Sequence, residues 1–415
     1  MSAGARSRSR RRPPGRVRPN QSGPLAGKRI ELAVDAVAAG GQCVARYDGR
    51  VVFVRHTLPG ERVLALVTWD RGGSYCRADA VEILDAAPDR VEPPCPHAGP
   101  GRCGGCDWQH VRPERQRELK ADLVRSALAR IGGVDPSAGP VAGLVVHALD
   151  PPDLGWRTRA QFAVDRQGRL GLRRHRSHEI EPAADCPLVT AGVRGALVGR
   201  HDPPGSIVEV TDAGGTVVVD MRRKRRATGP RPELREHALG HQFRLHGGSF
   251  WQVHPQAAAV LAHCVRVLLA PRPGERVLDL FAGVGLFGTA LADATGAPRQ
   301  VTVVEADPTA AADAAVNLPG ATVRPEPVTV DLVRRERADL VVLDPPRSGA
   351  GIDLTTAILG VGARAVAYVA CDPAALARDI KAATAAGWML RDLRAFDLFP
   401  MTEHVECVAI LAPGQ

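Results

Sequence analysis

The segment ERVLDLFAGVGLFGTALA, residues 275–292, constrains the fold more than any other part of the chain. It consists of a short apolar run, a turn with glycines at positions 283 and 285, and a helical pattern rich in Ala and Leu. From Gly274 onward, short apolar runs and helical patterns continue to alternate. This alternation is typical of strand–helix units that build a parallel, doubly wound sheet. We therefore expect an α/β domain over residues 241–415.

The N-terminal part of the chain has a different pattern, with shorter apolar runs. Five alternating apolar runs fall between residues 28 and 84, and turn signals such as Asp48-Gly49 and Pro59-Gly60 separate them. This spacing predicts a small β-barrel of the OB type over residues 25–87, a common scaffold for binding oligonucleotides. A barrel without a binding role is the alternative, and the strand pattern alone favours neither.

The positive charge of the chain is concentrated near its N-terminus. The net charge is +9, but seven arginines and no acidic residue lie in residues 1–20, so the remaining chain is nearly balanced. Residues 1–24 lack any periodicity and predict a disordered basic tail. No stretch approaches the ~18 apolar residues of a membrane span, and the Arg-rich start lacks the apolar segment of a secretory signal. We expect a cytoplasmic protein of two or three domains.

Three of the nine cysteines, Cys95, Cys103 and Cys106, lie within twelve residues. The CGGC run brings two sulfurs within reach of one ion, and Cys186 is a candidate fourth ligand. Cysteines in a reducing compartment are more often metal ligands, catalysts or free thiols than disulfides. Four thiolates suit a tetrahedral zinc ion or an iron–sulfur cluster, and chemistry alone does not separate the two. We expect this site in a β-rich central domain over residues 88–240.

The glycine turn at residues 281–285 is a candidate ligand site. Its glycines let a ligand approach the backbone, and Glu305, after the following apolar run, can accept hydrogen bonds from ribose hydroxyls. These features fit NAD as well as S-adenosylmethionine. A later apolar run ends in Asp344-Pro345-Pro346-Arg347, a rigid acidic turn at the edge where open α/β sheets bind ligands. Dinucleotide dehydrogenases have no use for such a turn, whereas class I methyltransferases that act on nucleic-acid bases resemble it closely.

Two candidate catalytic residues lie near the C-terminus. Cys371 ends an apolar strand in YVACDPAALARDI, just before a helical pattern. Free cysteines are often simply buried, but the N-terminal end of a helix favours the thiolate. In HVECVAIL, apolar neighbours of Glu406 are expected to raise its pKa and make it a better base. The alternative for Glu406 is a charge that protects a sheet edge, and Glu403 is a rival for the catalytic role.

Six motifs occur in the order CGGCDWQH, FWQVHP, LDLFAGVG, LDPPR, ACDPAALARD and FPMTEHVE between residues 103 and 406. Their combination resembles the S-adenosylmethionine-dependent RNA uracil-C5-methyltransferases that carry a TRAM domain and an iron–sulfur cluster. The run GGQCVARYDGRVVFVRHTLPGE resembles the TRAM domain itself. The resemblance implies a class I methyltransferase fold, which is a Rossmann-like doubly wound sheet, with an N-terminal OB-like TRAM barrel and a small central iron–sulfur domain.

The resemblance also assigns roles to individual residues. It implies a donor site lined by Gln252, Phe281, Glu305 and Asp344, catalysis by Cys371 and Glu406, and a [4Fe–4S] cluster held by Cys95, Cys103, Cys106 and Cys186. The chain departs from the family pattern at Leu286, His254 and Asp372, where relatives carry asparagine. Seven residues separate Cys95 from Cys103, where the family usually has five.

A thiolate and a base are needed because uracil C5 is a poor nucleophile. Addition of Cys371 to C6 makes an enolate, C5 accepts the methyl group, and Glu406 removes the C5 proton so that the thiolate can leave. The target base must lie in a loop or be flipped out of the RNA.

We therefore expect an RNA methyltransferase that acts on a uridine of ribosomal or transfer RNA, with no DNA or membrane partner. The sequence does not decide between the two RNA classes. An exocyclic-amine base methyltransferase, which needs the acidic turn but no nucleophile, is one alternative. A non-catalytic RNA-binding iron–sulfur protein is the other.

Overall fold

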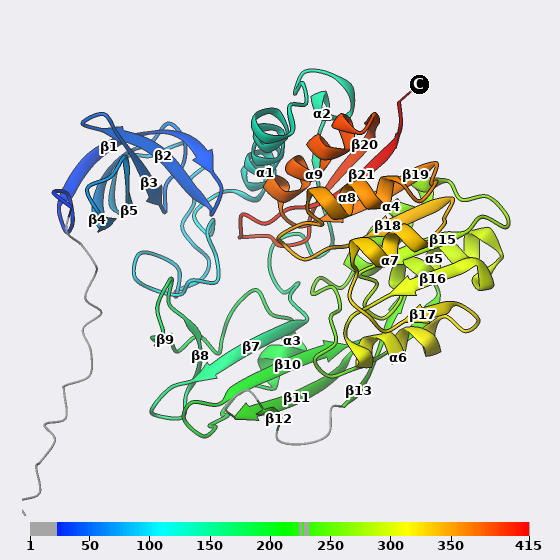
Figure 1. Cartoon of the computed structure of the whole chain (residues 1–415). Coiled ribbons are helices and arrows are strands. Elements are labelled where there is room, and N and C mark those ends of the chain that lie inside the picture. Colours follow the sequence, from blue (N-terminus) through cyan, green and yellow to red (C-terminus); the bar gives the residue numbers. More distant parts are fainter. Residues whose placement is uncertain (1–22, 224–225, 228–231, 415) are drawn as a thin grey trace, which may run out of the picture. The chain divides into compact units, whose positions relative to one another are not determined.

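The computed structural model describes residues 23–223, 226–227 and 232–414 (Figure 1). Apart from its last two residues, the predicted basic tail lies outside this range. The chain divides into two compact units, with the change at Pro88–Asp89 and the short segment Ala39–Gly41 grouped with the second unit. Each unit is described separately below.

The first unit is a closed barrel formed by β1 (Arg29–Ala38), β2 (Gln42–Tyr47), β3 (Arg50–Arg55), β4 (Arg62–Asp70) and β5 (Tyr75–Asp85). The strands follow the order β1-β2-β3-β5-β4, and only β3 and β5 run parallel. Side chains alternate along the strands, so residues such as Leu32, Val52 and Val63 fill the interior. The predicted N-terminal barrel is confirmed.

The smaller sheet of the second unit has six antiparallel strands in the order β12-β11-β10-β7-β8-β9. Its strands are β7 (Arg159–Val164), β8 (Leu170–Arg173), β9 (Ile180–Glu181), β10 (Ile207–Ala213), β11 (Thr216–Arg223) and β12 (Arg226–Ala227). The short helix α3 (Ala191–Gly195) lies in the connection before β10. Trp156, Phe162 and Val208 form the core of this region, and Cys186 belongs to the same cluster.

The larger sheet of the second unit has eight strands in the order β17-β16-β15-β18-β19-β21-β20-β6. Its C-terminal strands are β15 (Val277–Leu280), β16 (Val301–Val304), β17 (Thr322–Arg324), β18 (Leu340–Leu343), β19 (Ala365–Ala370), β20 (Trp388–Asp397) and β21 (Glu406–Pro413). Strands β15 to β19 are parallel and extend from β15 in both directions, whereas β21 is antiparallel to both of its neighbours. The predicted doubly wound sheet is confirmed.

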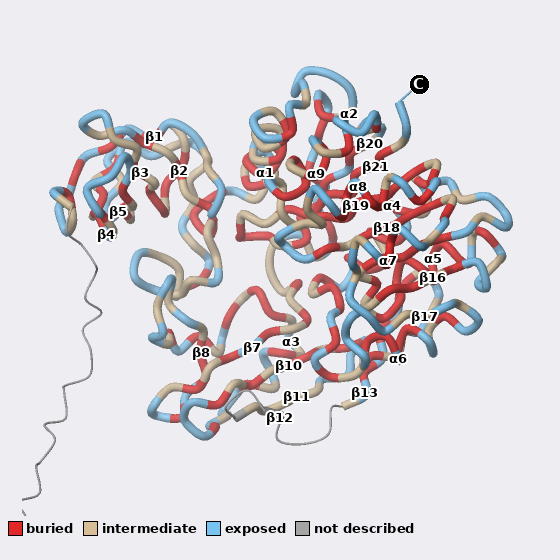
Figure 2. Tube along the Cα trace, viewed as in Figure 1, coloured by how far each residue is buried: buried red, intermediate tan, exposed pale blue. Residues whose placement is uncertain are grey.

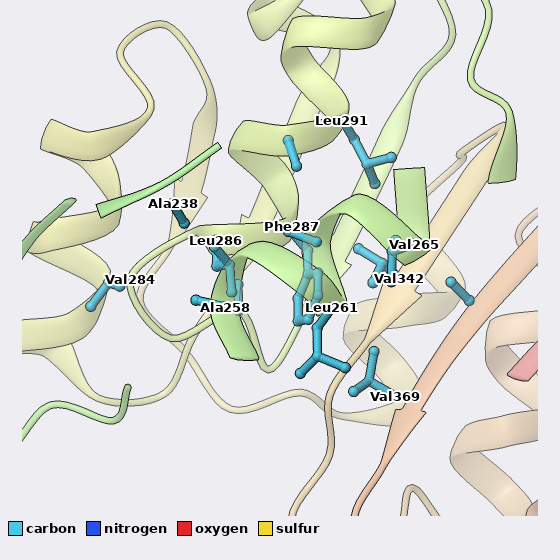
Figure 3. Packing of buried hydrophobic residues seen from close by; sticks show 14 of the residues in the cluster. Ala238, Ala258, Leu261, Val265, Val284, Leu286, Phe287, Leu291, Val342 and Val369 are labelled. Atoms are coloured by element: carbon cyan, nitrogen blue, oxygen red, sulfur yellow. The ribbon is translucent and has the colours of Figure 1, made fainter. Parts of the chain in front are cut away.

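Helices cover both faces of this sheet. They are α4 (Ala257–Leu269), α5 (Leu286–Thr295), α6 (Pro308–Asn317), α7 (Val330–Arg335), α8 (Ile352–Leu359) and α9 (Pro373–Ala385). The sheet strands are buried while the outer helix surfaces are exposed (Figure 2). On one face, Phe287 of α5 and Leu261 of α4 meet above the sheet (Figure 3). Asp307 and Asp372 cap the N-termini of α6 and α9, each followed by a proline suited to the first helical turn.

Two segments from the range predicted for the central domain also contribute to this sheet. Helix α1 (Pro113–Ala127) packs in the same hydrophobic cluster as α9, and β6 (Val146–Ala148) pairs with β20 at the sheet edge. A π-helical turn over Leu128–Gly132 and the short helix α2 (Gly139–Ala142) connect them. The hairpin of β13 (Glu233–Ala238) and β14 (His241–His246) packs on the opposite face. The domain limits at residues 88 and 240 stay predictions.

Among the residues that the structure describes, no helix is both long and apolar enough to cross a bilayer.

Candidate active site

The glycine turn after β15 is tied to the acid that follows β16. The Glu305 carboxylate accepts hydrogen bonds from the N–H groups of Gly283 at 2.9 Å and Asp307 at 2.7 Å. Gly283 and Gly285 have φ angles of 55° and 88°, in the left-handed region, and a Cβ on Gly285 would press on Ala314 at 3.4 Å. The turn therefore requires glycine and fixes the carboxylate of Glu305 beside it.

A small cavity opens between this turn and the loop before α4. Gln252, Phe281 and Asp344 line it, so three of the four predicted donor-site residues meet there. The fourth, Glu305, holds the glycine turn in the cavity wall. The cavity volume is only about 30 Å³, and Phe250 in its wall is 65% exposed. A ligand as large as S-adenosylmethionine must therefore lie mostly across the mouth of this cavity.

The three residues that depart from the family pattern have different surroundings. Leu286 lines the cavity with its side chain. His254 is buried, with its ring centroid 6.2 Å from that of Trp156 and its Nε2 atom 3.3 Å from the carbonyl oxygen of Pro151. Asp372 accepts a hydrogen bond from the backbone at the start of α9. Of these three departures, Leu286 is the one that lines the donor cavity.

The loop that follows Asp344 is held by α9. Asp379, which is fully buried, accepts hydrogen bonds from the N–H groups of residues 350 and 351 at 2.9 and 3.2 Å. It also accepts one from the hydroxyl of Tyr368 at 2.7 Å. Gly349 packs so closely that an added Cβ would lie 2.6 Å from a carboxylate oxygen of Asp379. These contacts hold the acidic turn in place.

Cys371 and Glu406 lie at the ends of neighbouring antiparallel strands. The pairing of β19 with β21 places Ala370 opposite Cys407. Cys371 directly follows Ala370, and Glu406 directly precedes Cys407. The charge of Glu406 acts on the pKa of the Cys371 thiol, so the two side chains lie near each other. The two predicted catalytic residues are therefore neighbours.

The surroundings of Cys371 disfavour the thiolate in the protein alone. Burial raises the pKa of Cys371 to about 11, and the charges of Glu406 and Asp344 act in the same direction. Arg347 opposes them. The N-terminal end of α9 begins two residues after Cys371, as expected.

The two acids share this environment. Glu406 is buried, and burial together with the charge of Asp344 raises its pKa well above the ordinary value, in the expected direction. Burial raises the pKa of Asp344 to about 7. The backbone nitrogen of the rival Glu403 lies 3.4 Å from a carboxylate oxygen of Asp107, and burial together with the charges of Asp107 and Asp372 raises the pKa of Glu403.

Two further charged residues of this site, Asp279 and Arg347, were not expected from the sequence to have a role. Asp279 of β15 is fully buried; its Oδ2 accepts a hydrogen bond from the N–H of Gly288, and its Oδ1 has no partner among the described residues. Burial and the charge of Asp344 raise the pKa of Asp279 to about 8. An acid inside the apolar run VLDL was the available signal. Arg347, noted only as part of a turn, is the cation whose charge acts on Cys371.

The four predicted cluster cysteines line one cavity of about 230 Å³ in the central region: Cys95, Cys103, Cys106 and Cys186. The N–H of Gly105 donates to the sulfur of Cys103 at 3.4 Å, and the side-chain amide of Gln109 donates to the sulfur of Cys106 at 3.3 Å. A Cβ on Gly104 would lie 2.7 Å from the Cα of His175, so the CGGC turn requires glycine there.

These thiols are not grouped tightly enough for a single ion. Across the described ranges, no three His, Cys, Asp or Glu side chains are arranged to hold one metal ion. Burial raises the pKa of all four thiols, to about 11 for Cys103. Arg157 lines the same cavity; burial lowers its pKa, and the charges of Cys186 and Cys106 raise it.

Aromatic and arginine side chains meet on the outer surface of the barrel. Trp69 of β4 and Tyr75 of β5 stack with their ring centroids 5.2 Å apart. The guanidinium groups of Arg71 and Arg77 lie 5.6 and 5.5 Å from the centre of the Trp69 ring. Such a surface combines stacking with positive charge, which suits unpaired nucleotides.

Models of two known families match segments near the two ends of the chain. The TRAM domain model matches residues 25–81, and the tRNA (Uracil-5-)-methyltransferase model matches residues 328–413. The second match includes the acidic turn, Cys371 and Glu406.

Whole-chain comparisons extend this agreement. An "uncharacterized RNA methyltransferase" of Streptomyces coelicolor is 47% identical, covering 94% of each chain. The 23S rRNA (uracil(1939)-C(5))-methyltransferase RlmD of Pseudomonas entomophila is 31% identical, again covering 94% of each chain. The fold is that of Pyrococcus abyssi tRNA (uracil-54, C5)-methyltransferase, with a TM-score of 0.66, 22% identity, and coverage of 92% of this chain and 99% of the other. The chain therefore belongs to the TRAM-domain family of RNA uracil-C5-methyltransferases.

Proposed function

We propose that this protein transfers a methyl group from S-adenosylmethionine to C5 of a uridine in RNA, with Cys371 as the nucleophile and Glu406 as the base. The observation that supports the proposal is the closeness of a thiol at the end of β19 to a buried acid at the start of β21, beside Asp344, seen in the effect of both acids on the pKa of Cys371. A methyltransferase for exocyclic amines has no need for a thiol close to a buried acid.

The reaction uses these groups in order. The thiolate of Cys371 adds to C6, and the electron pair of the C5–C6 double bond moves toward C5 and O4. C5 then attacks the methyl group, and S-adenosylhomocysteine leaves. The carboxylate of Glu406 takes the proton from C5, the double bond re-forms, and the bond between C6 and sulfur breaks.

The electrostatics of the site suit this order. Burial and the two acids disfavour the Cys371 thiolate in the protein alone. A sulfonium ion bound near Asp344 supplies positive charge, which lowers the pKa values of neighbouring acids and thiols. The nucleophile is thus activated only when the methyl donor is present.

The donor site would be formed by Gln252, Phe281, Glu305 and Asp344. Glu305 keeps free lone pairs beyond the two backbone hydrogen bonds it accepts, so it can also bind the ribose hydroxyls. Asp344 would lie beside the sulfonium, and the Phe281 ring and the Gln252 amide would line the rest of the site.

The central cavity is proposed to hold a [4Fe–4S] cluster through Cys95, Cys103, Cys106 and Cys186. The four thiols line a cavity of about 230 Å³, which leaves room for a group of several atoms. Thiolates are the usual ligands of such clusters. Arg157 and the amide of Gln109 would balance the negative charge on the sulfurs.

RNA is the proposed macromolecular partner, either ribosomal or transfer RNA, in the cytoplasm. The barrel surface around Trp69 and Tyr75 would contribute affinity, and its arginines would make binding salt-dependent.

Release of tritium from RNA labelled at uridine C5 tests the proposed reaction. The protein should release one tritium for each methyl group transferred, because C5 loses its hydrogen. Methyl transfer without tritium release would indicate an exocyclic amine as the acceptor. RNA binding without any methyl transfer would indicate a non-catalytic protein.

A further inference from the structure

A turn centred on Met401 connects the cysteine motif with the strand that carries Glu406. Met401 is 5% exposed, and its φ angle of 67° lies in the left-handed region. Its carbonyl oxygen accepts hydrogen bonds from the N–H groups of Asp107 and Trp108, both at 3.0 Å. These two residues directly follow Cys106 in the chain. The cysteine motif and the turn before Glu406 are therefore directly hydrogen-bonded to each other.

Gln116 of α1 completes this junction. Its side chain is buried, and its Oε1 accepts a hydrogen bond from the N–H of Met401 at 2.8 Å. Its Nε2 donates to the carbonyl oxygens of Val111 and Trp108 at 2.8 and 3.2 Å. A non-glycine residue stays in the left-handed region only where its surroundings hold it. Gln116 supplies such a restraint on Met401.

Lys120, one helical turn further along α1, holds the start of the same loop. Its Nζ donates to a carboxylate oxygen of Asp397 at 2.5 Å and to the carbonyl oxygen of Phe399 at 3.0 Å. Both charged side chains are buried. Gln116 and Lys120 are four residues apart, so they lie on one face of α1. That face restrains the loop at residues 397, 399 and 401.

We propose that Gln116 and Lys120 are positioning residues for the base Glu406. Together with the backbone N–H groups of Asp107 and Trp108, which follow Cys106, they form a clamp on the loop at residues 397–401. The inference rests on the proposed function. Four residues separate Met401 from Glu406, so a shift of the turn is transmitted to the carboxylate over a short path. Cys371 lies between β19 and α9, whereas Glu406 begins β21 directly after this turn. The turn is therefore much closer along the chain to the base than to the nucleophile.

This separation predicts a selective defect. Loosening the clamp displaces the base but leaves the nucleophile and the donor site unchanged. Thiolate addition and methyl transfer should continue, while removal of the C5 proton should slow. A displacement of about 1 Å at a reacting group can cost about 10²-fold in rate. The intermediate that accumulates is RNA joined to Cys371.

Gln116→Met in the full-length protein tests this inference. Methionine keeps the size of the side chain but removes its amide, so the N–H of Met401 loses its acceptor. We expect tritium release from C5-labelled RNA to fall by about 10²-fold, with single-turnover methyl transfer changed less than threefold. A covalent protein–RNA species should appear on a denaturing gel. Gln116→Glu keeps an acceptor for Met401 and should restore part of the tritium release.

Val124→Ala is the matched control, because Val124 is a buried residue of the same helix that packs in the sheet core and leaves the clamp intact. It should lower stability without accumulating the adduct. Equal slowing of methyl transfer and tritium release in Gln116→Met, or adduct in Val124→Ala, would overturn the inference. If Gln116→Met does not fold, Lys120→Met replaces it as the test, because it removes the ammonium that holds Asp397 and the carbonyl of Phe399. Wild-type tritium release by Lys120→Met would then overturn the inference. Absence of tritium release from the wild type would instead contradict the proposed function.

Discussion

The two cysteine sites differ in the groups that surround the thiol. Cys371 faces two buried acids, Glu406 and Asp344, with one arginine acting against them. The thiols of the central cavity face one another and share the cavity with Arg157. Burial raises the thiol pKa values at both sites.

At neither site do the surroundings favour the thiolate in the protein alone. A transient cation would suit Cys371 as the proposed nucleophile, because it would have to leave again after methyl transfer. A permanent cation would suit the four cysteines as proposed ligands, because ligands remain bound. We infer that the methyl donor supplies the first charge and iron the second.

The largest effect is expected from Cys371→Ala. This substitution removes the thiol that acts as the nucleophile in the proposed mechanism, so methylation should fall to background. Binding of S-adenosylmethionine, measured by calorimetry, should stay the same because other residues form the donor site. Cys264→Ala, at a half-buried thiol of α4, is the control and should remain active. Substantial turnover by Cys371→Ala would favour the exocyclic-amine alternative.

Glu406→Gln should have the next largest effect, because it removes the base but not the nucleophile. Loss of a general base typically slows a reaction by ~10²–10⁴-fold. The variant should transfer the methyl group once and then remain bound to RNA through Cys371, which a denaturing gel with labelled RNA detects. Glu403→Gln should turn over normally. If Glu403→Gln traps RNA instead, the base has been assigned to the wrong carboxylate.

The parallel, doubly wound sheet could be predicted from the sequence because it depends on local patterns. The apolar runs that end at Glu305, Asp344 and Cys371 are short and continuous, and the carboxyl ends of parallel strands meet at one edge. The strand order and the pairing of β19 with β21, which brings Cys371 near Glu406, are not specified by the sequence.

The features that could not be predicted from the sequence depend on contacts between segments that are far apart in the chain. Nothing local shows that α1 and β6 join the C-terminal sheet, since β6 has three residues and pairs with a strand almost 250 positions later. Gln116 and Lys120 look like ordinary polar positions of an exposed helix until Met401 and Asp397 are placed beside them. The raised pKa of Cys371 likewise arises from its burial and from the charges of Glu406 and Asp344, which lie far from it in the sequence.

The comparison also predicts different metal chemistry at the two sites. Protein purified without oxygen should be brown and contain iron and acid-labile sulfide. Cys106→Ser should lose most of the iron and lower the thermal unfolding midpoint, whereas Cys371→Ser should keep both unchanged. Stoichiometric zinc without iron in the wild type would contradict the cluster assignment.

The smallest expected effect is a change in the reactivity of Cys371 on donor binding. With a pKa of about 11, about one Cys371 thiol in a thousand is ionised at pH 8. A non-reactive donor analogue that carries a positive charge in place of the sulfonium should lower this pKa. A decrease of one pKa unit would speed alkylation by iodoacetamide about tenfold. Peptide mass spectrometry can follow Cys371 separately from Cys264, whose pKa burial also raises to about 11. Cys264 lies on α4 and should not respond to the analogue. An equal response at both thiols, or none at Cys371, would mean that the donor does not supply the charge that activates the nucleophile.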